Sequence, residues 1–169
     1  QAAAAHSAYP IIGVDLHDNR LKLARQLGAT HTIDGSNSNV EDEISKIVGP
    51  AGVDVFVENT GLPTVVELGY RMTKPQGRIV LVGVPSHGQK VSIPPLPLHF
   101  GKTLTGSHGG ESLPSCDIPR LYFLHAAGKI RLEEMITDIY PLKEINEAVD
   151  AMQSGAISGR CMISMEKTS

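Results

Sequence analysis

The sequence predicts an α/β fold built on a doubly wound parallel sheet. Three runs, at residues 10–15, 53–57 and 78–84, are apolar almost throughout, which is typical of strands buried on both faces of a parallel sheet. Helical patterns lie between these runs, and strands that alternate with helices favour parallel pairing through right-handed crossovers. The first run also ends in a carboxylate, Asp15, directly before a helical pattern.

The first part of the chain follows this alternation closely. Its predicted elements are a helix tail at 1–8, a strand at 10–15, a helix that ends at Gly28, a strand at 31–34 and a helix over 40–48. We expect Asp18 or Asn19 to cap the second of these helices. The same helix is expected to bury Leu23, Ala24 and Leu27.

The middle of the chain continues in the same way. Its predicted elements are a strand at 53–57, a helix from Pro63, a strand at 78–84 and, after a proline-rich loop, a strand at 102–107. The helix has Val65, Val66 and Leu68 for its buried side, and Gly77 is expected to break it.

The pattern changes after Gly109 and Gly110. The last predicted elements are a helix at 118–127, a strand at 136–140, a helix at 145–152 and a strand at 160–165. There is no internal repeat, so these elements form a distinct final segment.

Charge and cysteine content limit the classes of function. The 169 residues carry a net charge of -3 with scattered lysines and arginines, so neither nucleic acid nor a membrane surface is an expected partner. No run of apolar residues is long enough to span a bilayer. Cys116 and Cys161 form no Cys-x-x-Cys pair, so we expect no metal site in this segment. Two reduced cysteines fit a cytoplasmic protein, although their number alone leaves a disulfide open.

Asp15 is the main candidate binding residue. A carboxylate at the carboxyl end of a parallel strand accepts both hydroxyl protons of an adenosine ribose and repels a 2′-phosphate, which selects NAD over NADP. The plain alternative is an Asp that caps a helix or a turn. An acid that binds the ribose normally follows a glycine-rich phosphate loop by about 20 residues. Counting back from Asp15 runs off the chain, so we expect the first strand and phosphate loop to be missing.

Two later strand ends carry turns with glycine. Asn59-Thr60-Gly61 follows the strand at 53–57, and Val82-Gly83-Val84-Pro85 ends the strand at 78–84. Ligands of open α/β sheets bind just outside the carboxyl ends of the strands, where glycine lets the backbone approach a flat ligand. Each turn alone is a weak signal, but together they indicate one binding edge.

These motifs and their order resemble the medium-chain, zinc-dependent alcohol dehydrogenase family. The resemblance covers nearly the whole chain and rests on Leu27-Gly28-Ala29-Thr30, residues 52–61, residues 77–85, Ile145-Asn146-Glu147-Ala148 and Gly159-Arg160. It implies a Rossmann-like NAD-binding domain, truncated at its N-terminus, at residues 1–108. Residues 109–169 would return to an absent catalytic domain. In the strand order 3-2-1-4-5-6 the missing strand lies between two halves, which either close up or leave a slot for something else.

The resemblance also implies roles for particular residues. Asp15 would hold the adenosine ribose, with Arg20 beside it, and Arg160 would reach the pyrophosphate. Near the other end of the cofactor, contacts are implied for Asn59, Thr60, Gly61, Val82, Gly83, Val84, Ser107 and Gly109. For Arg20 and Arg160 the alternative is a solvated surface arginine.

The departures from the family pattern concern zinc. The ligands of the catalytic zinc and the four cysteines of the structural zinc are absent here, so we assign no catalytic and no metal-binding residue. The expected parent is a dehydrogenase of small alcohols or aldehydes that uses NAD and zinc, while this segment alone is expected to be inactive. The region 89–107 matches the edge at which these enzymes dimerise, so a homodimer or homotetramer is expected.

Two other functions stay open. An S-adenosylmethionine-dependent methyltransferase also uses an acid at a strand end to bind ribose, although residues 82–85 and Arg160 have no clear role in that fold. The chain could instead be a non-catalytic module for nucleotide binding or oligomerisation, which the missing zinc ligands favour.

Overall fold

The computed structural model describes residues 1–165, and their contacts divide the chain into two units. The first unit combines Gln1–Val40 with the chain from Ser115 onward, of which residues 115–165 are called the return segment below. The second unit is Glu41–Pro114. The functional division expected at residue 108 is a different boundary and stays a prediction; the last four residues of its C-terminal part lie outside the described residues.

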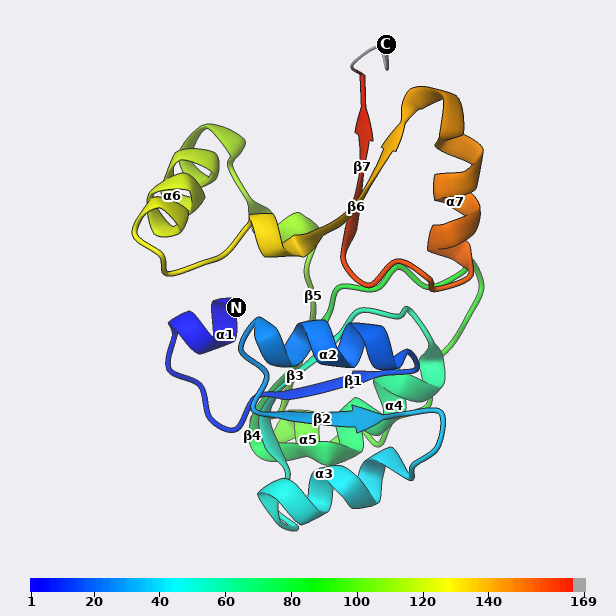
Figure 1. Cartoon of the computed structure of the whole chain (residues 1–169). Helices are drawn as coiled ribbons and strands as arrows, with labels where there is room; N and C mark the ends of the chain where they lie inside the picture. Colours follow the sequence, from blue (N-terminus) through cyan, green and yellow to red (C-terminus); the bar gives the residue numbers. More distant parts are fainter. Residues whose placement is uncertain (166–169) are drawn as a thin grey trace. The chain divides into compact units, whose positions relative to one another are not determined.

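The first unit begins with a βαβ arrangement (Figure 1). Its elements are α1 (Ala2–Ala5), β1 (Ile12–Asp15), α2 (Asp18–Gln26) and β2 (His31–Asp34). The two strands are parallel and in register from Ile12 opposite His31 to Asp15 opposite Asp34, and α2 packs on both. This places the side chain of Asp15 at the carboxyl end of the pair, as the sequence predicted.

The start and the buried face of α2 differ from expectation. The helix begins at Asp18 with His17 as its N-cap, and no side chain caps it. The amide of Asn19 is directed elsewhere, because its Nδ2 donates to carbonyl groups of the return segment. Leu21 is the buried residue of α2, while Leu23, Ala24 and Leu27 are half-buried.

The return segment supplies a second parallel pair to this unit. Its elements are α6 (Pro114–Ala126), η2 (Glu133–Met135), β6 (Ile136–Pro141), η3 (Leu142–Glu144), α7 (Ile145–Gln153) and β7 (Arg160–Ser164). β6 and β7 pair with each other, and α7 packs on both. The sequence predicted the two strands and the two α-helices to within a few residues, with α6 starting four residues earlier than expected, but it did not predict η2 or η3.

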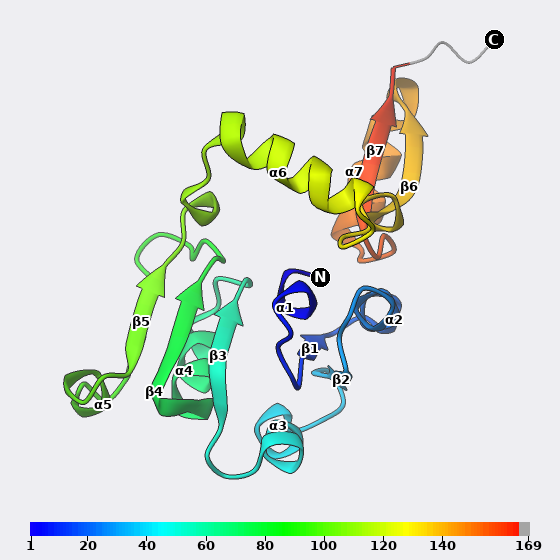
Figure 2. The same ribbon diagram turned by 90° about the vertical axis from the view of Figure 1, so that its left-hand side faces the viewer.

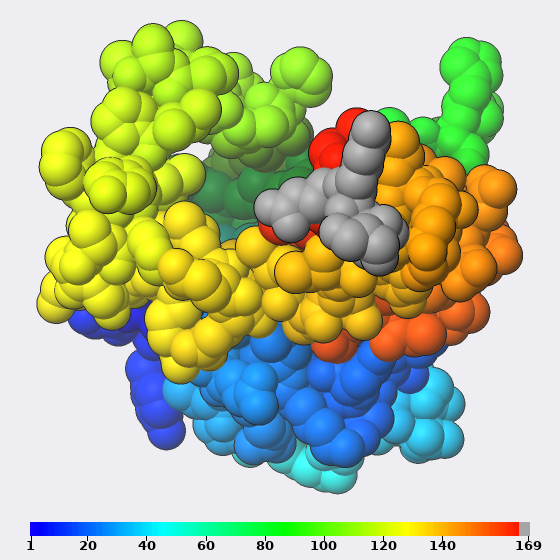
Figure 3. Space-filling model, turned by 45° about the horizontal axis from the view of Figure 1, so that its top comes forward, coloured from blue at the N-terminus to red at the C-terminus, as the bar shows by residue number. Residues whose placement is uncertain are grey.

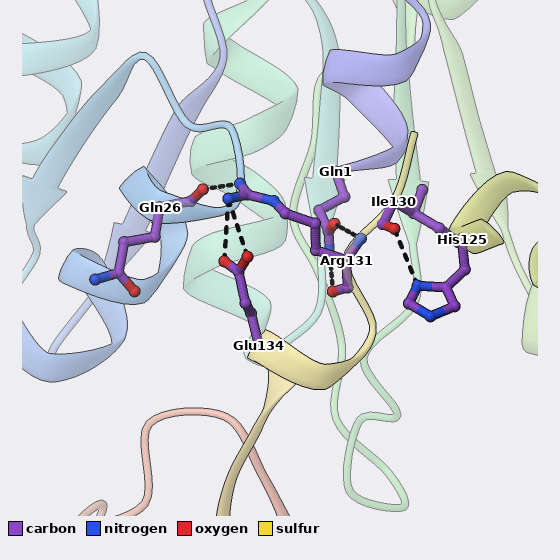
Figure 4. A network of polar contacts seen from close by, with 6 residues as sticks. All are labelled: Gln1, Gln26, His125, Ile130, Arg131 and Glu134. Atoms are coloured by element: carbon purple, nitrogen blue, oxygen red, sulfur yellow. Dashed lines mark hydrogen bonds and ion pairs between the residues drawn. The ribbon is translucent and has the colours of Figure 1, made fainter. Parts of the chain in front are cut away.

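Arg131 ties the return segment to α1 and α2 (Figure 4). Its backbone N–H donates to Oε1 of Gln1 at 2.6 Å, and Nε2 of Gln1 donates back to the Arg131 carbonyl at 3.1 Å. The guanidinium donates to the carbonyl of Gln26, the last residue of α2, and pairs with Glu134 at 3.1 Å. A cation at a helix C-terminus satisfies a carbonyl that has no partner inside the helix.

The second unit is a three-stranded parallel sheet (Figure 2). Its elements are α3 (Val40–Val48, whose first residue belongs to the other unit), β3 (Val53–Glu58), α4 (Pro63–Met72), β4 (Thr73–Leu81), α5 (Leu96–His99), β5 (Thr103–Gly106) and η1 (Gly109–Glu111). The strand order is β3-β4-β5, and α4 packs on β3 and β4. Its core includes Ile79, Tyr70 and Val66.

Three details of this unit correct the sequence prediction. α4 ends at Met72, where Oγ1 of Thr73 donates to the carbonyl of Gly69 at 2.6 Å, and Gly77 lies inside β4. A Cβ at Gly77 would meet the Asp54 carbonyl at 2.8 Å, so glycine serves close strand packing here. β4 ends at Leu81, short of the expected Val84.

Each of two sheets has an edge strand with one side unpaired within residues 1–165. The two-stranded sheet β1-β2 and the three-stranded sheet β3-β4-β5 are separate, so β1 and β3 each have one edge without a strand partner among the described residues. β3 was expected to be buried on both faces, but Val55 is 56% and Val57 59% exposed. Among residues 1–165, no helix has the length and apolar character needed to cross a membrane.

Candidate nucleotide-binding site

The carboxylate of Asp15 is oriented by its own loop and keeps one oxygen available. The backbone N–H of His17 donates to Oδ1 at 3.0 Å, and the side chain is about one-third exposed. Within residues 1–165, Oδ2 has no hydrogen-bond partner. An oriented and half-exposed carboxylate at a strand end is suited to accept the two hydroxyl protons of a ribose.

Asp34, the neighbour of Asp15 on the adjacent strand, has a carboxylate that is fully engaged in hydrogen bonds. The two residues are opposite each other at the ends of β1 and β2. The Asp34 carboxylate accepts bonds from the Ser36 hydroxyl and backbone and from the Asn37 amide. These bonds lower the pKa of Asp34, the Ser36 hydroxyl being the largest cause. Asp34 therefore completes a local turn, whereas Asp15 has an oxygen left for a ligand.

The structure places Arg20 near Asp15. Nη1 of Arg20 lies 3.9 Å from Oδ1 of Asp15, too far for a hydrogen bond, and both side chains are about one-third exposed. An ion pair of this kind contributes little stability. The guanidinium is thus available to interact with an anion.

Arg160 is the first residue of β7 and is exposed. Its guanidinium has no hydrogen bond or ion pair with any residue in the described part of the chain. The segment that precedes it lies against α2 (Figure 3). Asp15, Arg20 and Arg160 therefore belong to one unit, but no contact joins Arg160 to the other two.

Glu58 organises the turn after β3, a role that sequence reasoning missed. Its side chain is 1% exposed, and its Oε1 accepts the N–H of Thr60 at 2.6 Å as well as the Thr60 hydroxyl. The N–H of Gly61 donates to both carboxylate oxygens, at 3.0 and 3.1 Å. A buried carboxylate that collects backbone N–H groups fixes the shape of a loop. The available signal was an acid at the end of an apolar run, the same pattern as at Asp15.

Backbone hydrogen bonds join the three strand ends of the second unit. The carbonyl of Glu58 accepts the N–H groups of Val82 at 2.7 Å and Gly83 at 3.0 Å. One strand further, the carbonyl of Leu81 accepts the N–H of Ser107 at 2.8 Å. Figure 2 shows that β3, β4 and β5 end at the same edge. The structure thus brings the turns at 59–61 and 82–84 together with Ser107.

The surface of this edge has apolar and polar parts. Val82 is 46% and Val84 89% exposed, so apolar side chains are available to contact a ring. Ser107 accepts the N–H of Gly110 on its Oγ at 3.2 Å, and Gly109 has a positive φ of 62°. Asn59 and Thr60 are exposed beside them. This edge can therefore hold a flat heterocycle against valine side chains.

Metal donors are not grouped in the part of the chain that the structure describes. No cluster of three or more His, Cys, Asp or Glu side chains there could hold a metal ion. Cys116 and Cys161 are both free thiols. The residues present do not fit a zinc site, and we derive no chemistry through zinc for this chain.

The fold and the strand-end edge define the class of protein. Parallel strands with helical crossovers, in the order of the two halves of a dinucleotide-binding sheet, form a Rossmann-like domain. The sequence predicted this fold, and the comparison with solved structures below confirms it.

Comparison with known proteins gives the family. The zinc-binding dehydrogenase family model matches residues 1–122. Alcohol dehydrogenase 1 of Pisum sativum is 33% identical over 170 residues, covering 99% of this chain and 44% of that protein. Benzyl alcohol dehydrogenase from Acinetobacter calcoaceticus has a TM-score of 0.86 at 32% identity, covering 94% of this chain and 43% of its own. A protein described as a zinc-binding dehydrogenase from Sinorhizobium meliloti, bound to NADP, has a TM-score of 0.74 at 30% identity, covering 92% and 44%.

This chain belongs to the zinc-binding dehydrogenase family. It spans less than half the length of these relatives.

Proposed function

We propose that this chain is the NAD-binding part of a dehydrogenase that acts on a small alcohol or aldehyde. The observation that carries the proposal is the available Oδ2 of Asp15 at the carboxyl end of β1, in a chain of the zinc-binding dehydrogenase family. Asp15 would bind the hydroxyl groups of the adenosine ribose, with Arg20 beside it, and Arg160 would bind the pyrophosphate.

The strand-end edge of the second unit would bind the other end of the cofactor. Val82 and Val84 would pack against the nicotinamide ring, while Gly83, Ser107 and Gly109 would supply backbone and hydroxyl groups to its carboxamide. The rigid turn at 59–61 would contact the adjoining ribose. A bound nicotinamide would supply hydride-transfer chemistry between an alcohol and the corresponding carbonyl compound, and these residues would hold and orient its ring.

We favour NAD over NADP. The Sinorhizobium meliloti relative was solved with NADP. In this chain, the negative charge of Asp15 would face a 2′-phosphate, and Arg20 is 3.9 Å from that same carboxylate. Repulsion by Asp15 therefore opposes the phosphate that Arg20 would attract.

Self-association and location belong to the same proposal. β5 is at the edge of its sheet and follows α5, where Leu96 and the C-cap residue Phe100 are exposed, which supports pairing with a second copy as a homodimer or homotetramer. Two free cysteines support a cytoplasmic, reducing environment. Size-exclusion chromatography with light scattering measures the association, and a monomer at all concentrations would contradict it.

A fluorescence titration with NADH tests the cofactor. We expect saturable NADH binding, weaker NADPH binding and no binding of S-adenosylmethionine. We also expect no turnover of ethanol or benzyl alcohol by this chain alone, because we assign no catalytic residue to it. Binding of S-adenosylmethionine in place of NADH would favour the methyltransferase alternative. The absence of any nucleotide binding would leave an oligomerisation module.

A further inference from the structure

Residues at the start of α2 contact the loop that leads into β7. Nδ2 of Asn19 donates to the carbonyl oxygens of Gly155 at 3.2 Å and Ala156 at 3.0 Å. The imidazole of His17 lies directly over Gly155, where an added Cβ would be 2.9 Å from Nδ1 and still closer to other ring atoms. Figure 3 shows the red-orange residues before β7 directly against the blue residues of α2. One side of this loop is therefore fixed by two consecutive polar contacts and a ring.

The rest of the loop, up to Arg160, also follows α2. Ile157 is 4% exposed, and a Cβ at Gly159 would be 3.2 Å from Cδ2 of Leu23. The N–H of Gly159 donates to Oγ1 of Thr137 at 3.0 Å. The backbone position of Arg160 is thus determined by contacts that begin at Asn19 and end on β6.

The same turn of chain orients Asp15. The N–H of His17 donates to the Asp15 carboxylate, and Arg20 lies 3.9 Å from it. Asn19 lies between His17 and Arg20 in the sequence, and its Oδ1 accepts the N–H of Arg20 at 2.9 Å. The amide of Asn19 therefore bonds both to the backbone of Arg20 and to residues 155–156, which lie a few residues before Arg160.

We propose that Asn19 is a positioning residue that couples Arg160 to the ribose acid. The proposal rests on the function proposed above and adds that the first unit binds the adenosine diphosphate half of the cofactor. Asn19 touches no ligand itself. By fixing residues 155–156 against α2, it would lower the entropy that the exposed guanidinium of Arg160 loses when it binds a phosphate.

The affinities of the whole chain for ADP and AMP, measured by isothermal titration calorimetry, test this coupling. The two nucleotides share the ribose that Asp15 would bind and differ by the phosphate that Arg160 would reach. We expect Asn19→Ala to weaken ADP binding several-fold, the size of the entropy lost in ordering one long side chain, and to change AMP binding less than about twofold. Arg160→Ala should weaken ADP binding at least as much, roughly tenfold, the size of one lost charged hydrogen bond, and the double variant should lose no more than Arg160→Ala alone.

Two further variants keep the test interpretable. Asn146→Ala removes an exposed amide from α7 that makes no hydrogen bond among the described residues, and it should leave both affinities unchanged. If Asn19→Ala fails to fold, Asn19→Ser keeps a side chain suited to the first helical turn but too short to reach residues 155–156.

The outcomes separate the two proposals. An unchanged ratio of ADP to AMP affinity in Asn19→Ala, or additive losses in the double variant, overturns the role of Asn19 while leaving NAD binding intact. Failure of the wild-type chain to bind NADH, ADP and AMP overturns the proposed function and this inference with it.

Discussion

Gly83 and Gly61 face each other backbone to backbone at the ends of β4 and β3. A Cβ at Gly83 would overlap the backbone nitrogen of Gly61 and lie 2.7 Å from that of Thr60. Gly61 in turn has φ +75°, and a Cβ there would be 2.5 Å from the carbonyl oxygen of Val84. All of these obstacles are backbone atoms, so no side chain can move aside to relieve them.

Gly83→Ala should therefore separate the two turns. We expect a loss of about 1–3 kcal/mol in the free energy of unfolding, the usual cost of overpacking, and weaker NADH binding. Urea denaturation and NADH titration measure the two effects. Gly106→Ala is the matched control, because a Cβ at that strand end meets nothing within 4 Å. Equal stability of the two variants would show that the close approach is not maintained in solution.

Glu58→Gln tests whether the buried carboxylate shapes the turn. The amide group would face the N–H of Gly61 with a second donor in place of an acceptor, so one charge-assisted bond is lost and one repulsion is gained. We expect a loss of about 1–3 kcal/mol in the free energy of unfolding. NADH binding should weaken, while AMP binding, which we assign to the other unit, should not change.

Glu67→Gln is the control for this substitution. Glu67 accepts the N–H of Ser92 at 2.8 Å on one oxygen, a bond that glutamine can keep, so we expect an effect within about 0.5 kcal/mol. If Glu58→Gln is equally mild, the backbone bonds of the Glu58 carbonyl alone are enough to hold the turn.

Asp15 and Glu58 show what the sequence could and could not predict. Both acids end an apolar strand run, and that pattern correctly places each at the carboxyl end of a parallel strand. Their environments differ completely, since Asp15 is half-exposed and Glu58 is 1% exposed. The direction of the last side chain depends on the pleat and on the turn that follows. The sequence pattern contains neither, so it could not distinguish the partly exposed Asp15 from the buried Glu58, whose role in the turn it missed.

The predicted element boundaries were wrong where tertiary pairing overrides the local preference of the sequence. Residues 73–77 were expected to belong to the helix that Gly77 breaks, yet they form the start of β4, where Thr73 is paired with Val53. Similarly, Asn19 is a good capping residue by type, but its amide bonds to Gly155, 136 residues away. Contacts between distant segments cannot be read from local patterns.

Asp15→Asn tests the proposed ribose contact. Asparagine keeps the shape but removes the negative charge, so we expect NADH affinity to fall about tenfold, the size of a hydrogen bond to a charged group. The preference for NADH over NADPH should shrink, because the repulsion of a 2′-phosphate is lost. Asp34→Asn, at the end of the adjacent strand, should change neither affinity, since that carboxylate is occupied by Ser36 and Asn37. An unchanged NADH affinity in Asp15→Asn would remove the main support for the proposed site.

Lys102 directly precedes β5 and is buried, and its ammonium group lies at the C-terminal end of α4. Its ammonium donates to the carbonyls of Tyr70 at 2.7 Å and Thr73 at 2.6 Å and lies 4.7 Å from the centre of the Tyr70 ring. No carboxylate pairs with it within residues 1–165. Desolvation by burial lowers the pKa of Lys102 from its ordinary 10.5.

Because the pKa of Lys102 is lowered in the folded state, the free energy of unfolding must depend on pH in a definite direction. Between that lowered pKa and 10.5 the unfolded chain binds more protons, so the free energy of unfolding should rise with pH in this window. Lys102→Met should abolish the part of the rise due to this group. At pH 7 the variant should also lose about 1–3 kcal/mol, because two buried carbonyls lose their donor. Urea denaturation at pH 7 and pH 9.5 measures both effects, with exposed Lys90→Met as the control. If Lys102→Met were as stable as wild type and followed the same pH trend, the ammonium would contribute nothing to holding the end of α4.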